Sequence, residues 1–288
     1  MSLEDKLISA VIGLGAGLAG AYLKQPLVNY ALSSKLKSEY EYEQKKRLRQ
    51  LIGTYYGRFV ESAEKLNHRL LNLQENQDNF WLQVNGQFHR ADYYFSTTIY
   101  RFLSLLYLIN KFEVEALYID GRIAEKRDLE FVKFAKILEY VLADTTLFDG
   151  LAYDNNTAHD HFFRGHLVVA SETMEEDGTF VKMGLFLDKL KKRKYPQLLP
   201  ILAYFDGLAK NEPRFRWDRL VAFHLLLICF LNSFGYDMQK TDEAELARIS
   251  GSIRNPNVKM NLVKIIGKLG LQNNKSARIL LKHLKCES

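Results

Sequence analysis

Cysteine and proline are both scarce in this sequence. Of its 288 residues, two are cysteine (Cys229 and Cys286) and five are proline. Two cysteines form one disulfide at most, which excludes a disulfide framework and favours a reducing compartment for the main domain. The composition, with 47% hydrophobic and 26% charged residues, is that of a folded globular protein rather than a disordered one.

The sequence also lacks the motifs of several enzyme classes. It contains no Walker-type phosphate-binding loop, no Cys-x-x-Cys pair and no nucleophile elbow. Residues 15–20 match the letters of a dinucleotide-binding fingerprint, but no strand precedes them and no βαβ unit surrounds them. We therefore expect no cofactor.

One segment is uncharged in a chain that is otherwise charged throughout. Residues 7–23 contain no charged side chain, and Lys6 and Lys24 flank them. About 17 residues is the lower limit for a helix that spans a membrane, and flanking lysines reach the headgroups. We expect a single-pass membrane anchor. A secretory signal peptide and a buried or oligomerising helix are the alternatives.

Small residues recur at four-residue spacing within this run. Gly13, Gly17 and Ala21 share one register, and Gly20 follows Ala16 in another. This spacing lets helix backbones approach closely in lipid. It predicts that the anchor packs against a second copy or against a partner's helix.

Positive charge is concentrated after the run. Six lysines and arginines lie between residues 35 and 49, whereas Lys6 alone precedes the run, beside Glu4 and Asp5. Lysine and arginine mark the cytoplasmic side of a membrane helix. The pattern predicts a cytoplasmic domain that begins near residue 33.

Helical periodicity dominates the remaining sequence. Apolar residues recur at three- and four-residue steps over 47–73, 92–117 and 129–147, and 241–288 is typical of three shorter helices. No alternating run bounded by turns indicates a strand. We expect an all-α protein, in which one transmembrane helix precedes a multi-helix cytosolic bundle.

Four segments follow from these patterns. They are a membrane anchor at 1–32, a charged helical stalk at 33–60, a main helical domain at 61–240 and a basic C-terminal helical subdomain at 241–288.

Asp-Gly dipeptides recur about every 29 residues, at 120–121, 149–150, 177–178 and 206–207. Glycine after a last helical turn ends a helix. The similar segments 147–152 and 204–209 suggest duplicated helical pairs.

The net charge of +6 is unevenly distributed. One cluster comprises Lys189, Lys191, Lys192, Arg193 and Lys194. The C-terminal tail contributes Lys264, Lys268 and Lys275, and no acidic residue occurs between 254 and 285. These residues predict a surface for an anionic partner, either anionic lipid or nucleic acid. A solvated helix face is the alternative.

Two segments place histidine five residues after arginine, at Arg219 and His224 and at Arg278 and His283. Each resembles the Arg-x4-His signature of HEPN ribonucleases over six residues. The resemblance implies a helical ribonuclease in which arginine and histidine act on RNA phosphates across a dimer. The alternative is that His224 is a packed core residue.

His159, His161 and His166 are candidate metal ligands. A metal site needs three or four converging ligands, so Asp154 or Glu172 would have to complete the set. Because His159 and His161 face different ways on a helix, an exposed polar loop is the preferred interpretation.

Together these patterns predict a membrane-anchored, non-enzymatic adaptor, sensor or oligomerising membrane effector that binds a protein partner through its cytosolic domain. By analogy of architecture, such effectors occur in bacterial defence and toxin systems. One alternative is a HEPN-like ribonuclease that uses Arg219 and His224. Another is a nucleic-acid-binding helical module that uses the basic C-terminal tail.

Overall fold

The computed structural model describes residues 3–157, 159–193 and 196–286, apart from the side chains of 5–25, 27 and 286. Helix makes up 73% of the structure, which confirms the predicted all-α class. The α-helices are α1 (Leu3–Glu75), α2 (Tyr93–Ala116), α3 (Lys126–Ala143), α4 (Arg164–Glu172), α5 (Met183–Lys191), α6 (Leu199–Phe205), α7 (Arg216–Phe234), α8 (Glu243–Ser250), α9 (Pro256–Lys268) and α10 (Lys275–Cys286). Short 3-10 helices are η1 (Gln77–Asn79), η2 (Phe88–Arg90), η3 (Gly121–Ile123), η4 (Thr145–Phe148), η5 (Pro196–Leu198) and η6 (Asp237–Gln239), and the strands are β1 (Glu175–Glu176) and β2 (Thr179–Phe180).

α1 begins at the predicted anchor and continues without a break for 73 residues. The helix predicted over 47–73 is therefore the C-terminal part of a longer one. The backbone at Gly13, Gly17, Gly20 and Ala21 is helical. The side-chain environment of these residues lies outside the described part of the structure, so the close packing of anchors stays a prediction.

Packing divides the chain into two compact units. The first is Met1–Arg49 with Ile119–Ala124, and the second is Gln50–Tyr118 with Glu125–Ser288. Within the first unit, the backbone N–H of Asp120 donates to Oε1 of Gln44 (3.2 Å). The four segments predicted from the sequence stay a prediction.

α7 forms the centre of the second unit. All its residues from Arg216 to Leu231 are buried, and α3, α8, α9 and α10 pack against it. The ring centroids of Phe59, Phe131 and Phe230 lie between 4.9 and 5.6 Å apart. Each such ring contributes roughly 1.5–3 kcal/mol when it is fully buried.

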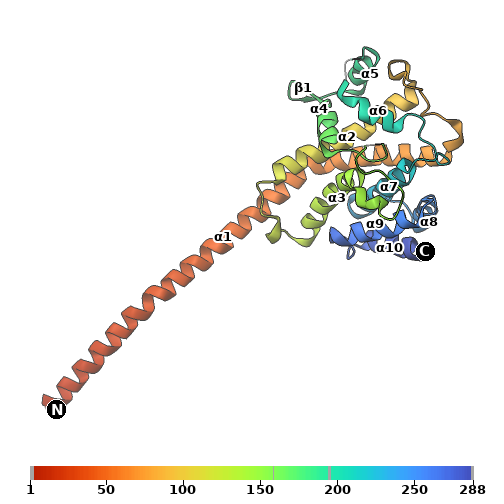
Figure 1. Cartoon of the computed structure of the whole chain (residues 1–288). Helices are drawn as coiled ribbons and strands as arrows, with labels where there is room; N and C mark the ends of the chain where they lie inside the picture. Colours follow the sequence, from red (N-terminus) through yellow and green to blue (C-terminus); the bar gives the residue numbers. More distant parts are fainter. Residues whose placement is uncertain (1–2, 158, 194–195, 287–288) are drawn as a thin grey trace. The chain divides into compact units, whose positions relative to one another are not determined.

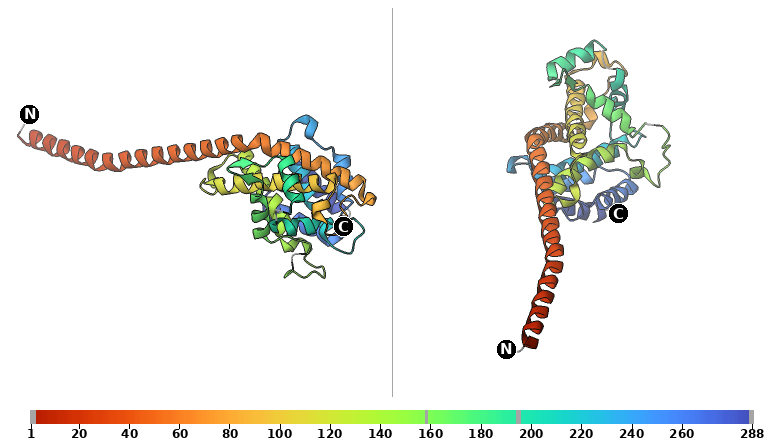
Figure 2. Two further views of the ribbon diagram at one scale, coloured as in Figure 1. Left: turned by 90° about the horizontal axis from the view of Figure 1, so that it is seen from above. Right: turned by 90° about the vertical axis from the view of Figure 1, so that its left-hand side faces the viewer.

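α7 is also, among the described residues, the one helix long and apolar enough to cross a membrane. Because 89% of its apolar stretch is buried among neighbouring helices, the role of α7 in the core accounts for its apolar composition. The strands β1 and β2 and the helices α4 to α6 lie at one end of the second unit, and α9 and α10 lie at the other (Figures 1 and 2).

A short hairpin corrects the expectation that the chain contains no strand. β1 pairs with β2 in antiparallel register, and Asp177 (φ 51°) and Gly178 (φ 70°) form the turn. Positive φ at both central residues is typical of the tight hairpin turn that Asp-Gly favours. The helix end predicted at this Asp-Gly is therefore wrong. Gly150 and Gly207 do adopt left-handed conformations (φ 80° and 67°) after helical turns, and the duplication of helical pairs stays a prediction.

Candidate functional site: a cationic groove

Arg219, the first residue of the predicted ribonuclease pair, is fully buried in α7. Its Nε donates to the carbonyl of Asp160 (2.7 Å), and its Nη1 donates to the carbonyls of Val141 and Asp144. The guanidinium lies over the ring of Phe148, 4.3 Å from the centroid. Burial lowers the pKa of Arg219 to about 10. Through these hydrogen bonds Arg219 connects α7 with two other segments, the end of α3 and the loop that precedes α4.

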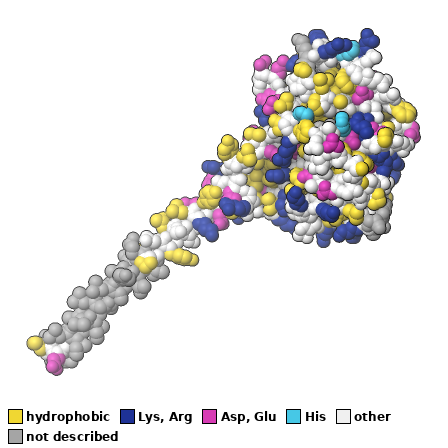
Figure 3. Space-filling model, viewed as in Figure 1, with side chains coloured by type: hydrophobic (Ala, Val, Ile, Leu, Met, Phe, Trp, Pro, Cys, Tyr) yellow, Lys and Arg dark blue, Asp and Glu magenta, His cyan; other side chains and the backbone are white. Residues whose placement is uncertain are grey.

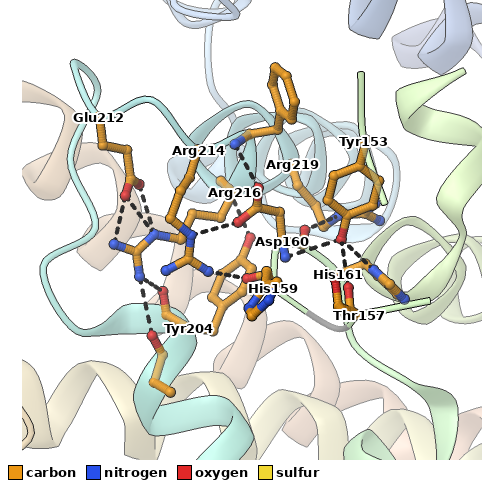
Figure 4. Close-up of polar contacts among 12 residues, drawn as sticks. Tyr153, Thr157, His159, Asp160, His161, Tyr204, Glu212, Arg214, Arg216 and Arg219 are labelled. Atoms are coloured by element: carbon orange, nitrogen blue, oxygen red, sulfur yellow. Dashed lines mark hydrogen bonds and ion pairs between the residues drawn. The ribbon is translucent and has the colours of Figure 1, made fainter. Parts of the chain in front are cut away.

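Asp160 holds the start of α7 in the same network, which Figure 4 shows. Its Oδ1 accepts from Nε of Arg214 (2.8 Å), and its Oδ2 accepts from the backbone N–H of Phe215 (2.9 Å). Next to it, Nη2 of Arg216 pairs with Glu212 (2.7 Å). Since both carboxylates already bind arginines, the network joins chain segments and offers neither carboxylate to a substrate.

His224, the second residue of the pair, is fully buried but has other partners. Its Nδ1 accepts from the side-chain amide of Gln74 (2.7 Å), and its Nε2 donates to Oδ1 of Asn67 (2.8 Å). Both amides lie on α1, whereas Arg219 binds carbonyls at the end of α3 and in the loop before α4. The two side chains share no hydrogen-bond partner. In the second segment of this kind, His283 lies 3.2 Å from Glu243.

The neutral state of His224 predicts a dependence of stability on pH. Burial and the nearby Arg248 lower its pKa to about 3, whereas an unfolded histidine titrates near 6.5. Below pH 6.5 His224 is protonated in the unfolded chain but stays neutral in the folded chain, so acid favours unfolding. Between pH 7 and pH 5 this group should lower the free energy of unfolding by about 2 kcal/mol.

Urea unfolding of the full chain in detergent, followed by the fluorescence of buried Trp217, measures this effect. Between the two pH values, the wild type should lose about 2 kcal/mol more than His224→Gln. Glu113, whose pKa burial raises to about 7, stabilises the folded chain as pH falls, but it does so in both proteins. The same pH dependence in both proteins would contradict the assignment.

The three candidate metal ligands are not assembled as a ligand set. His161 is buried, and its Nδ1 lies within hydrogen-bond distance of the Tyr153 hydroxyl. The ring of Phe163 contacts both His161 and His166, with centroids 5.3 and 5.4 Å away. His159 lies in the loop before them. Across the described ranges, no group of three His, Cys, Asp or Glu residues is placed to hold a metal ion.

A groove of about 640 Å³ lies where the starts of α3 and α10 meet the end of α7. Five exposed cations line it, and we name them the groove cations: Lys126, Arg127, Lys240, Lys275 and Arg278. Glu130 is the one carboxylate in its lining, and its Oε2 accepts from the amide of Asn274 (3.0 Å). Lys240 pairs with Asp237 (2.6 Å), so the excess positive charge of the groove comes from the other four groove cations.

The helix geometry adds to this field. Groove cations occupy the first turns of both α3 and α10. The first turn of α3 also contains Asp128, whereas the first turn of α10 contains no acid. A helix N-terminus carries partial positive charge, so cations at this end are repelled rather than stabilised. The first N–H groups of α10, at Ser276 and Ala277, donate to Oδ1 of Asn274 (3.0 and 3.1 Å). Asn274 thus caps the start of α10, whose first turn supplies no negative charge to balance the groove cations there.

Apolar side chains are exposed next to one groove cation. Met238 and Tyr236 in and before η6 are 86% and 64% exposed, and Lys240 lies two residues after Met238. Exposed aromatic and methionine side chains beside a charged rim are typical of protein interfaces.

The basic residues predicted for the tail divide between two places. Lys275 lines the groove. Lys264 and Lys268 lie on α9, where they donate to Oδ1 of Asn261 (3.1 Å) and to the hydroxyl of Tyr140 (2.7 Å).

The other predicted cluster lies around the end of α5. Lys189 pairs with a glutamate of the hairpin (2.6 Å), Arg193 contacts the ring of His89, and Lys191 and Lys192 are exposed. Lys194 lies outside the described residues.

Sequence reasoning missed three of the groove cations, Lys126, Arg127 and Lys240, because they are distant in sequence from the tail. The signal that could have found two of them is the dibasic pair at a helix start, where acidic residues are normally preferred.

No family model, no curated protein and no solved structure matches this chain. The function is therefore inferred from the geometry of the structure.

Proposed function

We propose that this chain is a membrane-anchored, non-enzymatic adaptor that binds an acidic segment of a protein partner through the cationic groove. The observation that carries the proposal is the continuity of α1. This one helix begins at the uncharged N-terminal run and ends among the core residues of the second unit, where Phe59 and Leu66 are fully buried.

Several features support the anchor. Residues 7–23 supply about the number of uncharged residues that a spanning helix needs. After them, α1 exposes apolar side chains (Figure 3), including Tyr30 (77% exposed) and Leu32 (54%). Tyrosine is typical of membrane–water interfaces. The excess of lysine and arginine after the run favours a cytoplasmic domain, and the spacing of small residues favours self-association of the anchor.

The composition of the groove favours an acidic peptide over nucleic acid. Met238 and Tyr236 offer apolar contact that a peptide side chain can use. Lys264 and Lys268 bind groups of the protein itself rather than extending the groove as a track for phosphates.

The non-enzymatic assignment is supported by the use of Arg219 and His224 in the core. A ribonuclease site needs both groups at one solvent-accessible position, whereas each is 0% exposed and bound to different segments. This placement favours the adaptor over the HEPN-like alternative.

Charge reversal in the groove tests the partner class. The double variant Lys275→Glu with Arg278→Glu removes the excess positive charge, and we expect it to weaken binding of a fluorescein-labelled hexaglutamate peptide at least tenfold at low salt. Lys264→Glu with Lys268→Glu makes the same change of net charge on α9, and it should alter the affinity less than about twofold.

Equal losses in the two double variants would show general attraction to a basic surface and would contradict a specific groove. A single-stranded oligonucleotide of the same charge serves as the second probe. If the wild type bound it more tightly than the peptide, and lost this binding on groove reversal, the nucleic-acid alternative would replace the proposal.

Fractionation of the full chain tests the anchor. We expect the protein to stay in membranes after both high-salt and alkaline washes, because burial of an apolar helix does not depend on ionic strength. Release by high salt alone would assign attachment to the basic surfaces and overturn the anchor.

A further inference from the structure

A second cavity, of about 510 Å³, lies beside the hairpin. Its walls come from α1 between residues 58 and 65, from α2 between residues 100 and 108, and from residues 178–180 of the hairpin. The volume falls within the range of about 300–1,000 Å³ that is typical of small-molecule sites. None of the proposed anchor or groove residues lines this cavity, so the inference drawn from it is independent of the proposed function.

Three aromatic rings form the apolar part of the cavity. The centroid of Phe180 lies 6.4 Å from that of Tyr100 and 5.4 Å from that of Tyr107. Both tyrosine hydroxyls are engaged by the protein, since Tyr100 donates to the carbonyl of Val181 (3.1 Å) and Tyr107 donates to Glu175 (3.0 Å). What the rings offer a ligand is therefore apolar surface, which suits a flat aromatic group.

The charged part of the cavity lining comprises three cations and one carboxylate, Glu61. Lys65 is paired with Glu61 (2.5 Å) on the same helix. Arg101 donates to the carbonyl of Lys65 (3.3 Å). In the part of the chain that the structure describes, neither Arg58 nor Arg101 has a carboxylate partner. Two uncompensated guanidinium groups beside a partly enclosed cavity favour a ligand with a compact dianion, because arginine binds phosphate oxygens in a bidentate manner.

The hairpin wall is held in place before any ligand enters. Lys111 pairs with Glu175 (2.6 Å), and Lys189 pairs with Glu176 (2.6 Å). The N–H of Val181 donates to the carbonyl of Met174 (2.9 Å) and closes the hairpin base. A cavity whose wall is fixed in this way avoids most of the ordering cost of binding.

We propose that this cavity binds a nucleoside monophosphate. The base packs against Tyr100, Tyr107 and Phe180, and the phosphate accepts hydrogen bonds from Arg58 and Arg101. Hydroxyl groups of Ser62 and Thr179 also line the cavity and face the remaining polar part of the ligand, the sugar.

Calorimetric titration of the full chain in detergent with AMP, GMP, CMP and UMP tests this proposal. We expect at least one of them to bind with a dissociation constant below about 100 μM. The matching nucleoside and inorganic phosphate should each bind at least tenfold more weakly, because each supplies half of the contacts. Absence of binding by all four nucleotides at about 1 mM would overturn the proposal.

Two variants locate the binding. Arg58→Gln removes a cation whose side chain has no ion pair among the described residues, so folding should be unaffected while nucleotide affinity falls at least tenfold. Phe180→Ala should weaken the nucleotide but leave the weak binding of phosphate unchanged. Arg127→Gln, which removes the same charge at the cationic groove, is the matched control and should leave the nucleotide affinity unchanged.

Equal losses in Arg58→Gln and Arg127→Gln would assign binding to general charge and contradict the site. Phosphate that binds as tightly as the nucleotide would reduce the cavity to an anion site. A 5′-phosphorylated dinucleotide that binds more tightly than every mononucleotide would show that the ligand is the 5′ end of a nucleic-acid strand. This result would overturn the assignment to a free nucleotide.

Discussion

Replacing Arg219 with methionine should lower the free energy of unfolding by at least about 3 kcal/mol. The guanidinium is fully buried and donates to the carbonyls of Asp160, Val141 and Asp144. Methionine fills much of the same volume but donates nothing, so three carbonyls lose a donor. A buried acceptor left without a partner costs roughly 1–3 kcal/mol.

One effect acts in the opposite direction, because methionine also removes a charge that burial disfavours. The lowering of the pKa of Arg219 to about 10 reflects this cost. The relief is partial, since the acceptors belong to the backbone and cannot be substituted together with the arginine. Urea unfolding in detergent measures the difference. Arg122→Met is the control, because the side chain of Arg122 is 89% exposed and surface ion pairs stabilise little. Equal midpoints for the two variants would contradict the role assigned to Arg219.

The second large effect concerns the anchor. We expect the double variant Leu14→Asp with Leu18→Asp to leave the membrane fraction almost completely. An aspartate near the centre of a spanning helix costs roughly 2.5–3.5 kcal/mol, so two should cost about 6 kcal/mol. The glycines in the run already weaken both its hydrophobicity and its helix propensity. The free energy of membrane insertion of the anchor is therefore only modestly favourable.

The matched control makes the same two changes further along the same helix. Leu32 and Leu36 are 54% and 57% exposed on α1, and Leu32→Asp with Leu36→Asp should keep the chain in alkaline-washed membranes. The measurement is the fraction of protein in the washed pellet. If both double variants stayed in the pellet, or both left it, residues 7–23 would not be the anchor.

Local signals in the sequence predicted several helices well. The helix predicted over 92–117 is α2, and its N-cap Asp92 accepts from the N–H of Phe95 (3.0 Å). The three C-terminal helices predicted over 241–288 are α8, α9 and α10. Asn255 is the N-cap of α9, and Pro256 lies in its first turn. Caps and periodicity involve neighbours in sequence, so one sequence is enough to read them.

Other features could not be predicted from the sequence pattern, for different physical reasons. The helix predicted over 129–147 ends at Ala143, because Asp144 instead accepts from the N–H of Thr146 (2.7 Å) and starts η4. The hairpin was missed because strands of two residues are too short to alternate. The cationic groove was found only in part, since Lys275 was predicted but Lys126, Arg127 and Lys240 reach it through the packing of α3, α7 and α10.

We propose that residues 7–23 cross the membrane and leave the remaining chain in the cytoplasm. Labelling with a membrane-impermeant maleimide tests it most directly, in a Cys286→Ser background. Native Cys229 stays unlabelled, because it is 0% exposed and burial raises the pKa of its thiol to about 12. The Ser2→Cys variant should be labelled on intact cells, and the Ser38→Cys variant only after the membrane is permeabilised. Labelling of both variants only after permeabilisation would contradict a spanning helix.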